Sequence, residues 1–414
     1  MHNFLIQFKD RTPDQKQPSP KAVLRKAVRK TRLQRLNKEI VRIRTQWKAG
    51  LIADLPPIMV TNELRGTMYI NYGFSLGALE EYSKALVTEE KAVAFYRSLA
   101  SEYGYASYTK DLALALHNCG TTLSNMGRHE DALSAEQEAI SLYRTLNVGG
   151  QGQRGDLADA LRGYGTTLYD MGRHEDALSA EQEAVSLYRT LNVDVQEHKE
   201  GLADALHNYG ITLSDMGRHE DALSVQQEAV SLYRTLNVDG QEHKVDLAVA
   251  LHNYGITLSD MGCHEDALSV QQEAVSLYCT LNVDGQEHKE GLAGALYNYG
   301  ITLSNMGHHK DALSVRQEAV SLYRTLSVDG QEHKEGLAGA LHNYGSTLSN
   351  MGCHEDALSA RQEAVSLYRT LNVDGKEHKE GLSCALHLYG LTLSIMGRHE
   401  DALSVRQEAF RLLL

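Results

Sequence analysis

Proline is scarce in this sequence and is confined to its first part. The 414 residues include five prolines, and none follows Pro57. Because proline breaks the interior of a helix, the proline-free stretch from Ile58 to Leu414 fits a domain of packed helices. Hydrophobic residues make up 42% of the chain and charged residues 23%, a composition that excludes a disordered polar chain over most of this length.

Long apolar runs and paired cysteines are also missing. The longest apolar runs fall far short of the ~18–20 residues that a membrane-spanning helix needs, and the opening residues MHNFLIQFKDR lack the apolar stretch of a secretory signal. An odd number of cysteines without close pairs argues against a disulfide framework. The five are Cys119, Cys263, Cys279, Cys353 and Cys384. We therefore expect a cytoplasmic protein with no transmembrane segment.

Charge is distributed unevenly along the chain. Residues 1–66 carry 15 basic and 5 acidic side chains, a net charge of +10, whereas residues 67–414 carry 26 basic and 49 acidic side chains, a net charge of −23. The acidic main body argues against a nucleic-acid platform, so nucleic acid is not expected as its partner.

The dominant feature of the sequence is a tandem repeat with a period of 45 residues. A marker glycine ends the motif HNYG and its variants, and a second glycine follows seven residues later in an MG dipeptide. Units 200–244 and 245–289 share 40 of their 45 residues. A diverged copy at Gly73 precedes seven copies with marker glycines Gly120, Gly165, Gly210, Gly255, Gly300, Gly345 and Gly390. Such self-similarity over eight units predicts a solenoid.

Each unit predicts two helices. From Leu202 to Leu213, apolar side chains recur three and four residues apart, which is typical of one face of a helix. Gly217 stands where a glycine ends a helix, and a second helix is expected from about His219 to Leu236. Its predicted buried stripe is Ala222, Leu223, Ala229, Val230, Tyr233 and Leu236. A lone pair of such helices cannot bury its apolar faces, whereas stacked pairs can.

The spacing of small residues resembles the tetratricopeptide repeat. The residues that carry the resemblance in this unit are Gly210, Gly217, Ala222 and Ala229. The long unit is similar to the kinesin light-chain-like branch, as in the repeat arrays of fungal immune-receptor-like proteins. The resemblance covers about residues 60–414 and implies an all-α, right-handed α-solenoid of about eight helix pairs. The sequence departs from the family in lacking its late proline and in carrying Gln226 or Glu181 where a bulky aromatic residue is common.

Four parts are expected along the chain. Residues 1–20 are predicted to be a disordered tail, 21–52 a basic amphipathic helix, 53–60 a linker and 61–414 the repeat domain. An a/d-like seam of the basic helix consists of Leu33, Leu36, Ile40, Ile43 and Trp47. Such a helix could dock on its own solenoid, dimerise, lie on anionic lipid, or act in nuclear import or nucleic-acid binding.

An asparagine recurs two residues before the marker glycine in six of the eight units. The six are Asn71, Asn118, Asn208, Asn253, Asn298 and Asn343. The resemblance implies that first helices line a concave groove and that this position points into it, like the asparagine ladder with which some family members hold a peptide main chain. A carboxamide donates and accepts hydrogen bonds, which matches a backbone amide. Selectivity is then expected from neighbouring positions of the same face: His207, His252, His342, Asp215 and Asp260. The alternative is that the asparagines cap or bridge neighbouring helices.

No motif in the sequence points to catalysis or to a metal. Histidines form columns at the repeat period, but a metal ion needs several ligands at about 2 Å, and equivalent residues of stacked repeats lie roughly 10 Å apart. HExxH, paired CxxC, P-loop and GxSxG motifs do not occur. The sequence therefore predicts no enzyme, no cofactor and no metal.

These patterns predict a non-catalytic scaffold or adaptor that binds an extended peptide or a partner protein of unknown identity in the concave groove. The alternative is the ligand-sensing repeat region of an NLR-like signalling NTPase whose NTPase domain is absent from this chain. Because the last unit stops inside its second helix at Leu414, we also expect self-association through an uncapped C-terminal end.

Overall fold

The computed structural model is helical throughout the residues that it describes. These are residues 57–104, 106–146, 151–191, 195–236, 241–281, 286–326, 331–371 and 376–412. They contain 16 helices and no strand, which confirms the predicted all-α fold. The predicted tail of residues 1–20 and the predicted basic helix of residues 21–52 lie outside the described residues.

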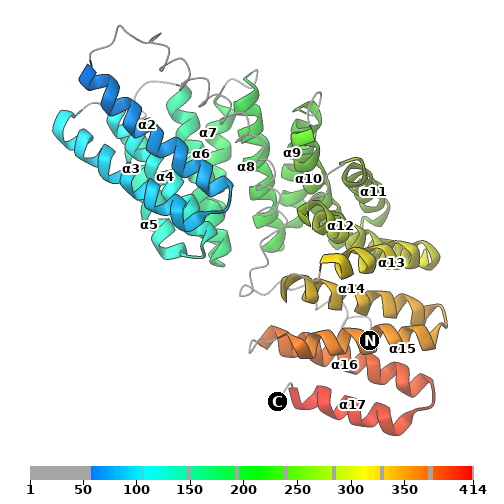
Figure 1. Cartoon of the computed structure of the whole chain (residues 1–414). Helices are drawn as coiled ribbons and strands as arrows, with labels where there is room; N and C mark the ends of the chain where they lie inside the picture. Colours follow the sequence, from blue (N-terminus) through cyan, green and yellow to red (C-terminus); the bar gives the residue numbers. More distant parts are fainter. Residues whose placement is uncertain are drawn as a thin grey trace. The chain divides into compact units, whose positions relative to one another are not determined.

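The helices form eight consecutive pairs, each made of the first and the second helix of one repeat (Figure 1). The first helices are α2 (Pro57–Ala78), α4 (Ala106–Asn125), α6 (Gln151–Asp170), α8 (Gln196–Asp215), α10 (Gln241–Asp260), α12 (Gln286–Asn305), α14 (Gln331–Asn350) and α16 (Lys376–Ile395). The second helices are α3 (Tyr82–Tyr103), α5 (His129–Leu146), α7 (His174–Arg189), α9 (His219–Leu236), α11 (His264–Thr280), α13 (His309–Leu326), α15 (His354–Thr370) and α17 (His399–Leu412).

The start of α2 differs from the predicted organisation. Because α2 begins at Pro57, residues 57–60 are helical, whereas the sequence predicted a linker there. Proline is favoured at the first position of a helix, since its fixed φ suits the helix and its missing N–H would have no partner in that turn. Pro57 therefore begins α2.

A glycine turn separates the two helices of each repeat. In the repeat of α8 and α9, the N–H of Arg218 donates to the carbonyl of Leu213 at 2.9 Å, and the N–H of Gly217 donates to the carbonyl of Ser214 at 3.0 Å. This is the Schellman pattern that ends helices. Gly217 has φ +75°, a left-handed conformation that costs glycine little. The next helix begins at His219, as predicted.

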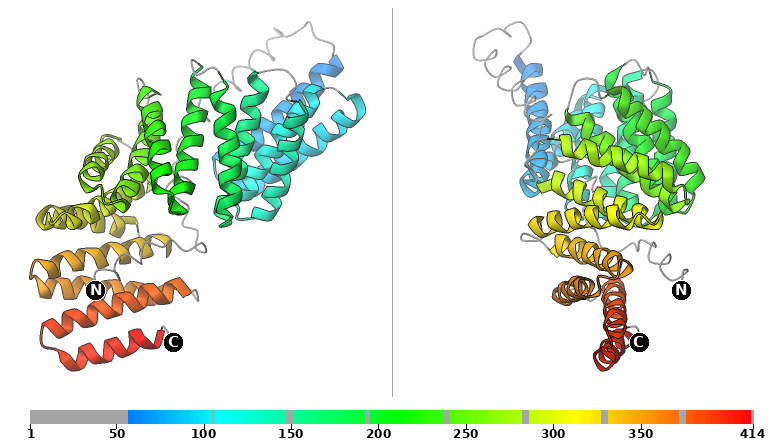
Figure 2. Two further views of the ribbon diagram at one scale, coloured as in Figure 1. Left: turned by 180° about the vertical axis from the view of Figure 1, so that it is seen from behind. Right: turned by 90° about the vertical axis from the view of Figure 1, so that its right-hand side faces the viewer.

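The described chain divides into two compact units, residues 57–243 and residues 244–412. Within the units, the two helices of a repeat pack together from α2 and α3 to α8 and α9, and from α12 and α13 to α16 and α17. The second helices α3, α5, α7, α11, α13 and α15 also pack against the first helix of the following repeat. Figure 2 shows this side-by-side arrangement for the helices from α13 to α17. The helices from α3 to α8 and from α12 to α16 are thus each covered on two sides by neighbours.

The core of each pair combines alanines with larger side chains. In α9, Ala222 and Ala229 are fully buried, and Val230, Tyr233 and Leu236 are buried beside them. Leu223 of the same predicted stripe is half-buried. Small residues at the crossing points let the helices approach closely, and the leucines and tyrosines fill the space around them.

Candidate functional site

Neighbouring first helices touch one another directly in both units. Contacts join α2 to α4, α4 to α6 and α6 to α8 in the first unit, and α12 to α14 in the second. The predicted asparagines all lie on first helices. We use the name A face for the surface of the first helices that carries this asparagine column.

The asparagines occupy equivalent places on six first helices. Asn71 lies on α2, Asn118 on α4, Asn208 on α8, Asn253 on α10, Asn298 on α12 and Asn343 on α14. Asn208 is buried, whereas the other five are half-buried. The column is therefore present at the surface of both units, with one member covered.

Several of these carboxamides contact the preceding repeat. Asn298 Nδ2 lies 3.3 Å from His252 Nε2, and Asn343 is hydrogen-bonded to the Tyr297 side chain. Asn208 Nδ2 donates to Thr166 Oγ1 at 3.3 Å. The three asparagines thus bridge first helices of adjacent repeats, which is the alternative role that the sequence left open. A carboxamide has two N–H donors and one acceptor oxygen, so one such bond leaves hydrogen-bonding capacity.

The three histidines predicted to add selectivity have different environments. His207 and His252 are buried, and His342 is half-buried. The His207 ring makes an edge contact with Tyr233, with 6.4 Å between ring centroids. Burial, together with the cations Arg361 and Arg316, lowers the pKa of His342 to about 4. This imidazole is therefore neutral at physiological pH.

The two predicted aspartates are the last residues of their helices. Asp215 ends α8 and Asp260 ends α10, and both are half-buried. The hydroxyl of Tyr169 donates to the Asp215 carboxylate. Asp215 therefore links α8 to the repeat before it.

The structure also reveals a column of buried polar side chains that sequence reasoning did not assign to a site. It lies in the middle of the second helices, 16 residues after each marker glycine, and its members are Glu89, Glu136, Glu181, Gln226, Gln271, Arg316, Arg361 and Arg406. The members from Glu89 to Arg361 are all buried, and Arg406 is half-buried. A polar residue recurring within an otherwise apolar stripe was the signal that could have identified it.

The marker glycine makes room for this column. A Cβ added at Gly120 would lie 2.5 Å from Glu136 Cγ, and a Cβ added at Gly300 would lie 2.7 Å from Arg316 Cγ. Such distances are far inside van der Waals contact. The side chain of the second helix therefore crosses the first helix where that helix has no side chain of its own.

Beyond the glycine, the side chain reaches the first helix of the next repeat. Thr167 Oγ1 donates to Glu136 Oε1 at 3.2 Å. Arg316 Nη1 donates to the carbonyl of Asn343 at 2.8 Å and to Thr347 Oγ1. Each of these side chains therefore joins three helices of two repeats.

Arg361 repeats the arrangement one unit later. Its Nη1 donates to the carbonyl of Leu388 at 2.8 Å and to Thr392 Oγ1, and its Nη2 lies 3.5 Å from Ser346 Oγ. The acceptors are neutral carbonyl and hydroxyl oxygens. Burial lowers the pKa of Arg361 to about 10, which leaves the group charged at neutral pH.

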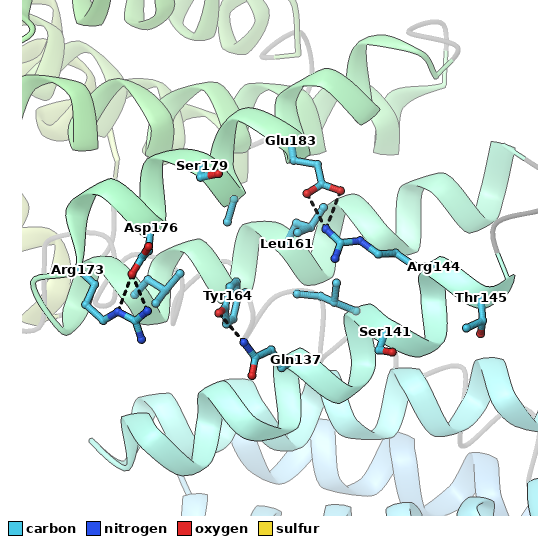
Figure 3. Close-up of a pocket in the computed structure, with 13 residues that line it drawn as sticks. Gln137, Ser141, Arg144, Thr145, Leu161, Tyr164, Arg173, Asp176, Ser179 and Glu183 are labelled. Atoms are coloured by element: carbon cyan, nitrogen blue, oxygen red, sulfur yellow. Dashed lines mark hydrogen bonds and ion pairs between the residues drawn. The ribbon is translucent and has the colours of Figure 1, made fainter.

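A surface recess of about 730 Å³ lies in the first unit, between second helices α5 and α7 and above α6 (Figure 3). Arg144 and Glu183 meet there, with 2.7 Å between Nη2 and Oε2, and Gln137 Nε2 donates to the Tyr164 hydroxyl at 3.1 Å. The same arginine–glutamate pair recurs in other repeats, for example between Arg189 and a glutamate 39 residues later. These contacts join neighbouring second helices.

The described part of the chain contains neither a cluster of metal ligands nor a membrane-spanning helix. Its His, Cys, Asp and Glu side chains form no group of three or more that could hold a metal ion. None of the described helices has the length and apolar character to span a membrane.

Comparison with family models gives two matches. The model described as "Tetratricopeptide repeat" matches residues 112–148, 154–198 and 202–243. The model described as "Anaphase-promoting complex subunit 5" matches residues 237–279, 282–328 and 327–390. A comparison with curated proteins gave no match.

Solved structures share the fold at low sequence identity. The apo form of the quorum sensor NprR from B. thuringiensis aligns with a TM-score of 0.60 and 13% identity, covering 95% of this chain and 98% of that chain. The apo form of RapI aligns with a TM-score of 0.59 and 13% identity, covering 84% and 96%. A putative kinesin light chain of Podosopora anserina with nearly identical TPR-like repeats aligns with a TM-score of 0.43 and 11% identity, covering 52% and 95%.

The repeat match, the shared fold and the eight stacked helix pairs agree with the family that the sequence resembles. The repeated glycine turn and the 45-residue unit run through all seven of the regular copies. Residues 112–243 therefore carry tetratricopeptide repeats, and the described chain has the fold of a tetratricopeptide-like solenoid.

Proposed function

We propose that this chain is a non-catalytic scaffold that binds an extended peptide, or an extended segment of a partner protein, along its A face. The observation that carries the proposal is the asparagine column on neighbouring first helices. Asn253, Asn298 and Asn343 lie on three successive first helices of the second unit and are half-buried. Their spacing suits a main chain that passes across several repeats.

The hydrogen bonds between repeats support the proposal in a specific way. Because Asn298 Nδ2 lies against His252, the carboxamide has a fixed orientation before any ligand arrives. A group that is already oriented loses less conformational entropy when it binds. Bridging two repeats and holding a main chain are therefore compatible roles for the same side chain.

The experiment selects ligands and then removes the asparagines. Random dodecapeptides displayed on phage are selected on the immobilised full chain, and the tightest peptide is measured by fluorescence anisotropy. We expect the triple substitution N253A/N298A/N343A to weaken its binding by about tenfold or more, since each net hydrogen bond contributes about 0.5–1.5 kcal/mol.

A matched control uses the same three repeats. Gln272, Gln317 and Gln362 are exposed on the second helices α11, α13 and α15, so Q272A/Q317A/Q362A should leave binding unchanged. Full binding by the asparagine variant, with a lower melting temperature, would show that the column is purely structural. Failure to select any peptide would contradict the proposed function itself.

The sensor alternative would use the A face in the same way. It is favoured by the near identity of units 200–244 and 245–289, which share 40 of 45 residues, because duplicated units can diverge toward new ligands. A peptide or protein ligand would then bind to the repeats, and this binding would change the activity of a separate NTPase.

A further inference from the structure

The buried column of the second helices changes its chemistry along the chain. It is glutamate in the first three repeats, glutamine in the next two and arginine in the last three: Glu89, Glu136, Glu181, Gln226, Gln271, Arg316, Arg361 and Arg406. The backbone position and the marker glycine are the same throughout. The change in side chain is therefore a change of charge at one fixed place.

The two ionisable types respond differently to burial. Burial raises the pKa of Glu136 to about 8, so this carboxyl is mostly protonated and neutral at pH 7. Burial lowers the pKa of Arg316 and of Arg361 to about 10, so both guanidinium groups keep their charge. The second unit thus holds two permanent buried cations.

These cations have no acidic partner among the described residues. The acceptors of Arg316 and Arg361 are the carbonyls of Asn343 and Leu388 and the hydroxyls of threonine and serine side chains. The Nε atoms of both are buried without a hydrogen bond in this part of the chain. A buried charge without a counter-ion is costly, which points to an anion supplied from outside.

The guanidinium groups lie beneath the A face. Arg316 passes between α12 and α14 and bonds to the backbone of Asn343, a member of the asparagine column. His342, next to Asn343, is close enough for both arginines to lower its pKa. An extended ligand that follows the asparagines therefore crosses directly above these cations.

The A face also loses its own carboxylates in the same repeats. The last residue of the first helix is aspartate in α6, α8 and α10, whereas it is Asn305, Asn350 and Ile395 in α12, α14 and α16, and Ala78 and Asn125 in α2 and α4. In α14 the glutamate nearest to Thr347 is Glu335, which precedes it by 12 residues, about 18 Å along the helix. The absence of an aspartate at the ends of α12 and α14, and the distance of Glu335, leave the potential above Arg316 and Arg361 positive.

We propose that the buried middle position of the second helices sets the charge preference of the A face, so that the repeats containing Arg316 and Arg361 take a ligand segment bearing carboxylates, and the repeats with glutamine or glutamate at this position take neutral segments. This inference rests on the proposed peptide-binding function and names the ligand chemistry of part of that face.

The chain itself supplies the substitutions for a test. Gln271 occupies the same position, and its Nε2 donates to the carbonyl of Gly255 at 3.4 Å, so R316Q/R361Q places a side chain that other repeats already accommodate. R324Q/R369Q is the matched control, because these exposed arginines lie on the same helices and pair with Glu363 and Glu408. Both double variants remove the same net charge.

Random dodecapeptides on phage are selected in parallel on the full-length wild-type chain and on the variants. We expect aspartate and glutamate to be enriched by the wild type and by R324Q/R369Q, and not by R316Q/R361Q. R316K/R361K should keep the enrichment because it keeps the charge. A selected acidic peptide should bind R316Q/R361Q about tenfold more weakly than the wild type, and its binding should weaken with salt.

A gain-of-function variant completes the design. Gln271→Arg adds a guanidinium beside Asn298 and Thr302, which stand where Asn343 and Thr347 stand for Arg316, so it should tighten binding of the acidic peptide. Selection of peptides without acidic enrichment would overturn this inference and leave the proposed function intact. Equal loss in R316Q/R361Q and R324Q/R369Q would also overturn it, since net charge would then be sufficient. If no peptide is selected at all, both proposals fall.

Discussion

Three repeats of the first unit carry a carboxyl group and three repeats of the second unit carry a guanidinium group at the same position, and the remaining repeat of each unit carries glutamine. Glu136 and Arg316 both cross a marker glycine and both end at a threonine of the next repeat. Thr167 donates a hydrogen bond to the carboxyl of Glu136, whereas Thr347 accepts one from the guanidinium of Arg316. A hydroxyl can do either.

The comparison shows how one backbone accommodates opposite chemistry. The glycine provides space. The threonine, which is almost fully buried at positions 167 and 347, provides a hydroxyl that can either donate or accept a hydrogen bond. The difference that remains is electrostatic. A buried carboxyl can take up a proton and lose its charge, but a guanidinium stays charged at neutral pH.

Replacing the buried carboxyl or the buried guanidinium with glutamine should show this difference in protonation. It gives the largest expected change in the free energy of unfolding. The folded-state pKa of Glu136 is raised to about 8, above its value in the unfolded chain. Between the two pKa values the unfolded chain releases a proton that the folded chain keeps. Stability is therefore greatest at low pH and falls as the pH rises to about 8.

We expect Glu136→Gln to remove this fall and to stabilise the chain at pH 8.5 by at most about 5 kcal/mol. Arg361→Gln should instead change the stability by the same amount at every pH from 5 to 8.5, because the guanidinium, with its pKa lowered by burial to about 10, stays charged over this whole range. Urea unfolding followed by circular dichroism at both pH values measures each difference. Glu138→Gln, at an exposed residue of the same helix, is the control. A Glu136→Gln effect that is the same at pH 5 and pH 8.5 would contradict the raised pKa.

The marker glycines give the next largest effect. A Cβ at Gly120 would lie 2.5 Å from Glu136 Cγ, and a Cβ at Gly345 would lie 3.0 Å from Arg361 Cγ. We expect Gly120→Ala to destabilise the chain by about 1–3 kcal/mol, as overpacked cores do, and Gly345→Ala to cost less because its contact is longer. Thermal unfolding measures both.

Gly77 provides the control for this experiment. A Cβ there would lie 3.7 Å from Thr122 Oγ1, which is ordinary contact. Since alanine favours helix formation over glycine by about 1 kcal/mol, Gly77→Ala should be neutral or stabilising. Equal destabilisation at all three glycines would mean that the crossing side chain is not the reason for the marker position.

The repeat period made much of the fold predictable from the sequence. The turn at Gly217 and the bounds of α9, from His219 to Leu236, agree with expectation, because helix periodicity and glycine caps are local signals. The start of α2 at Pro57 was misplaced, since a proline fits both a linker and a first turn. Local patterns do not distinguish the two.

The contacts between repeats were less predictable. The sequence shows an asparagine column and a histidine column, but not that Asn298 of one repeat contacts His252 of the preceding one. That contact depends on the stacking distance and offset of two helices, which no spacing within a single repeat specifies. The use of the asparagines and their neighbours for binding stays a prediction, as does self-association through the C-terminal end.

The smallest expected effect concerns a surface pair that one repeat lacks. Exposed arginines of the second helices pair with a glutamate of the next second helix, as Arg324 does with Glu363 at 2.6 Å. In α11 the equivalent residue is Cys279, which is exposed. Partial burial of the thiol raises its pKa, and the nearby carboxylate of Glu318 raises it further. Cys279→Arg should restore the pair.

Exposed ion pairs contribute about 0.2–1 kcal/mol, and arginine is also the better helix former. A double-mutant cycle with Glu318→Gln, measured by urea unfolding at low and high salt, separates the two causes. We expect a coupling energy of about 0.5 kcal/mol that disappears at high salt; a gain from Cys279→Arg that is the same with and without Glu318 would assign it to helix propensity alone.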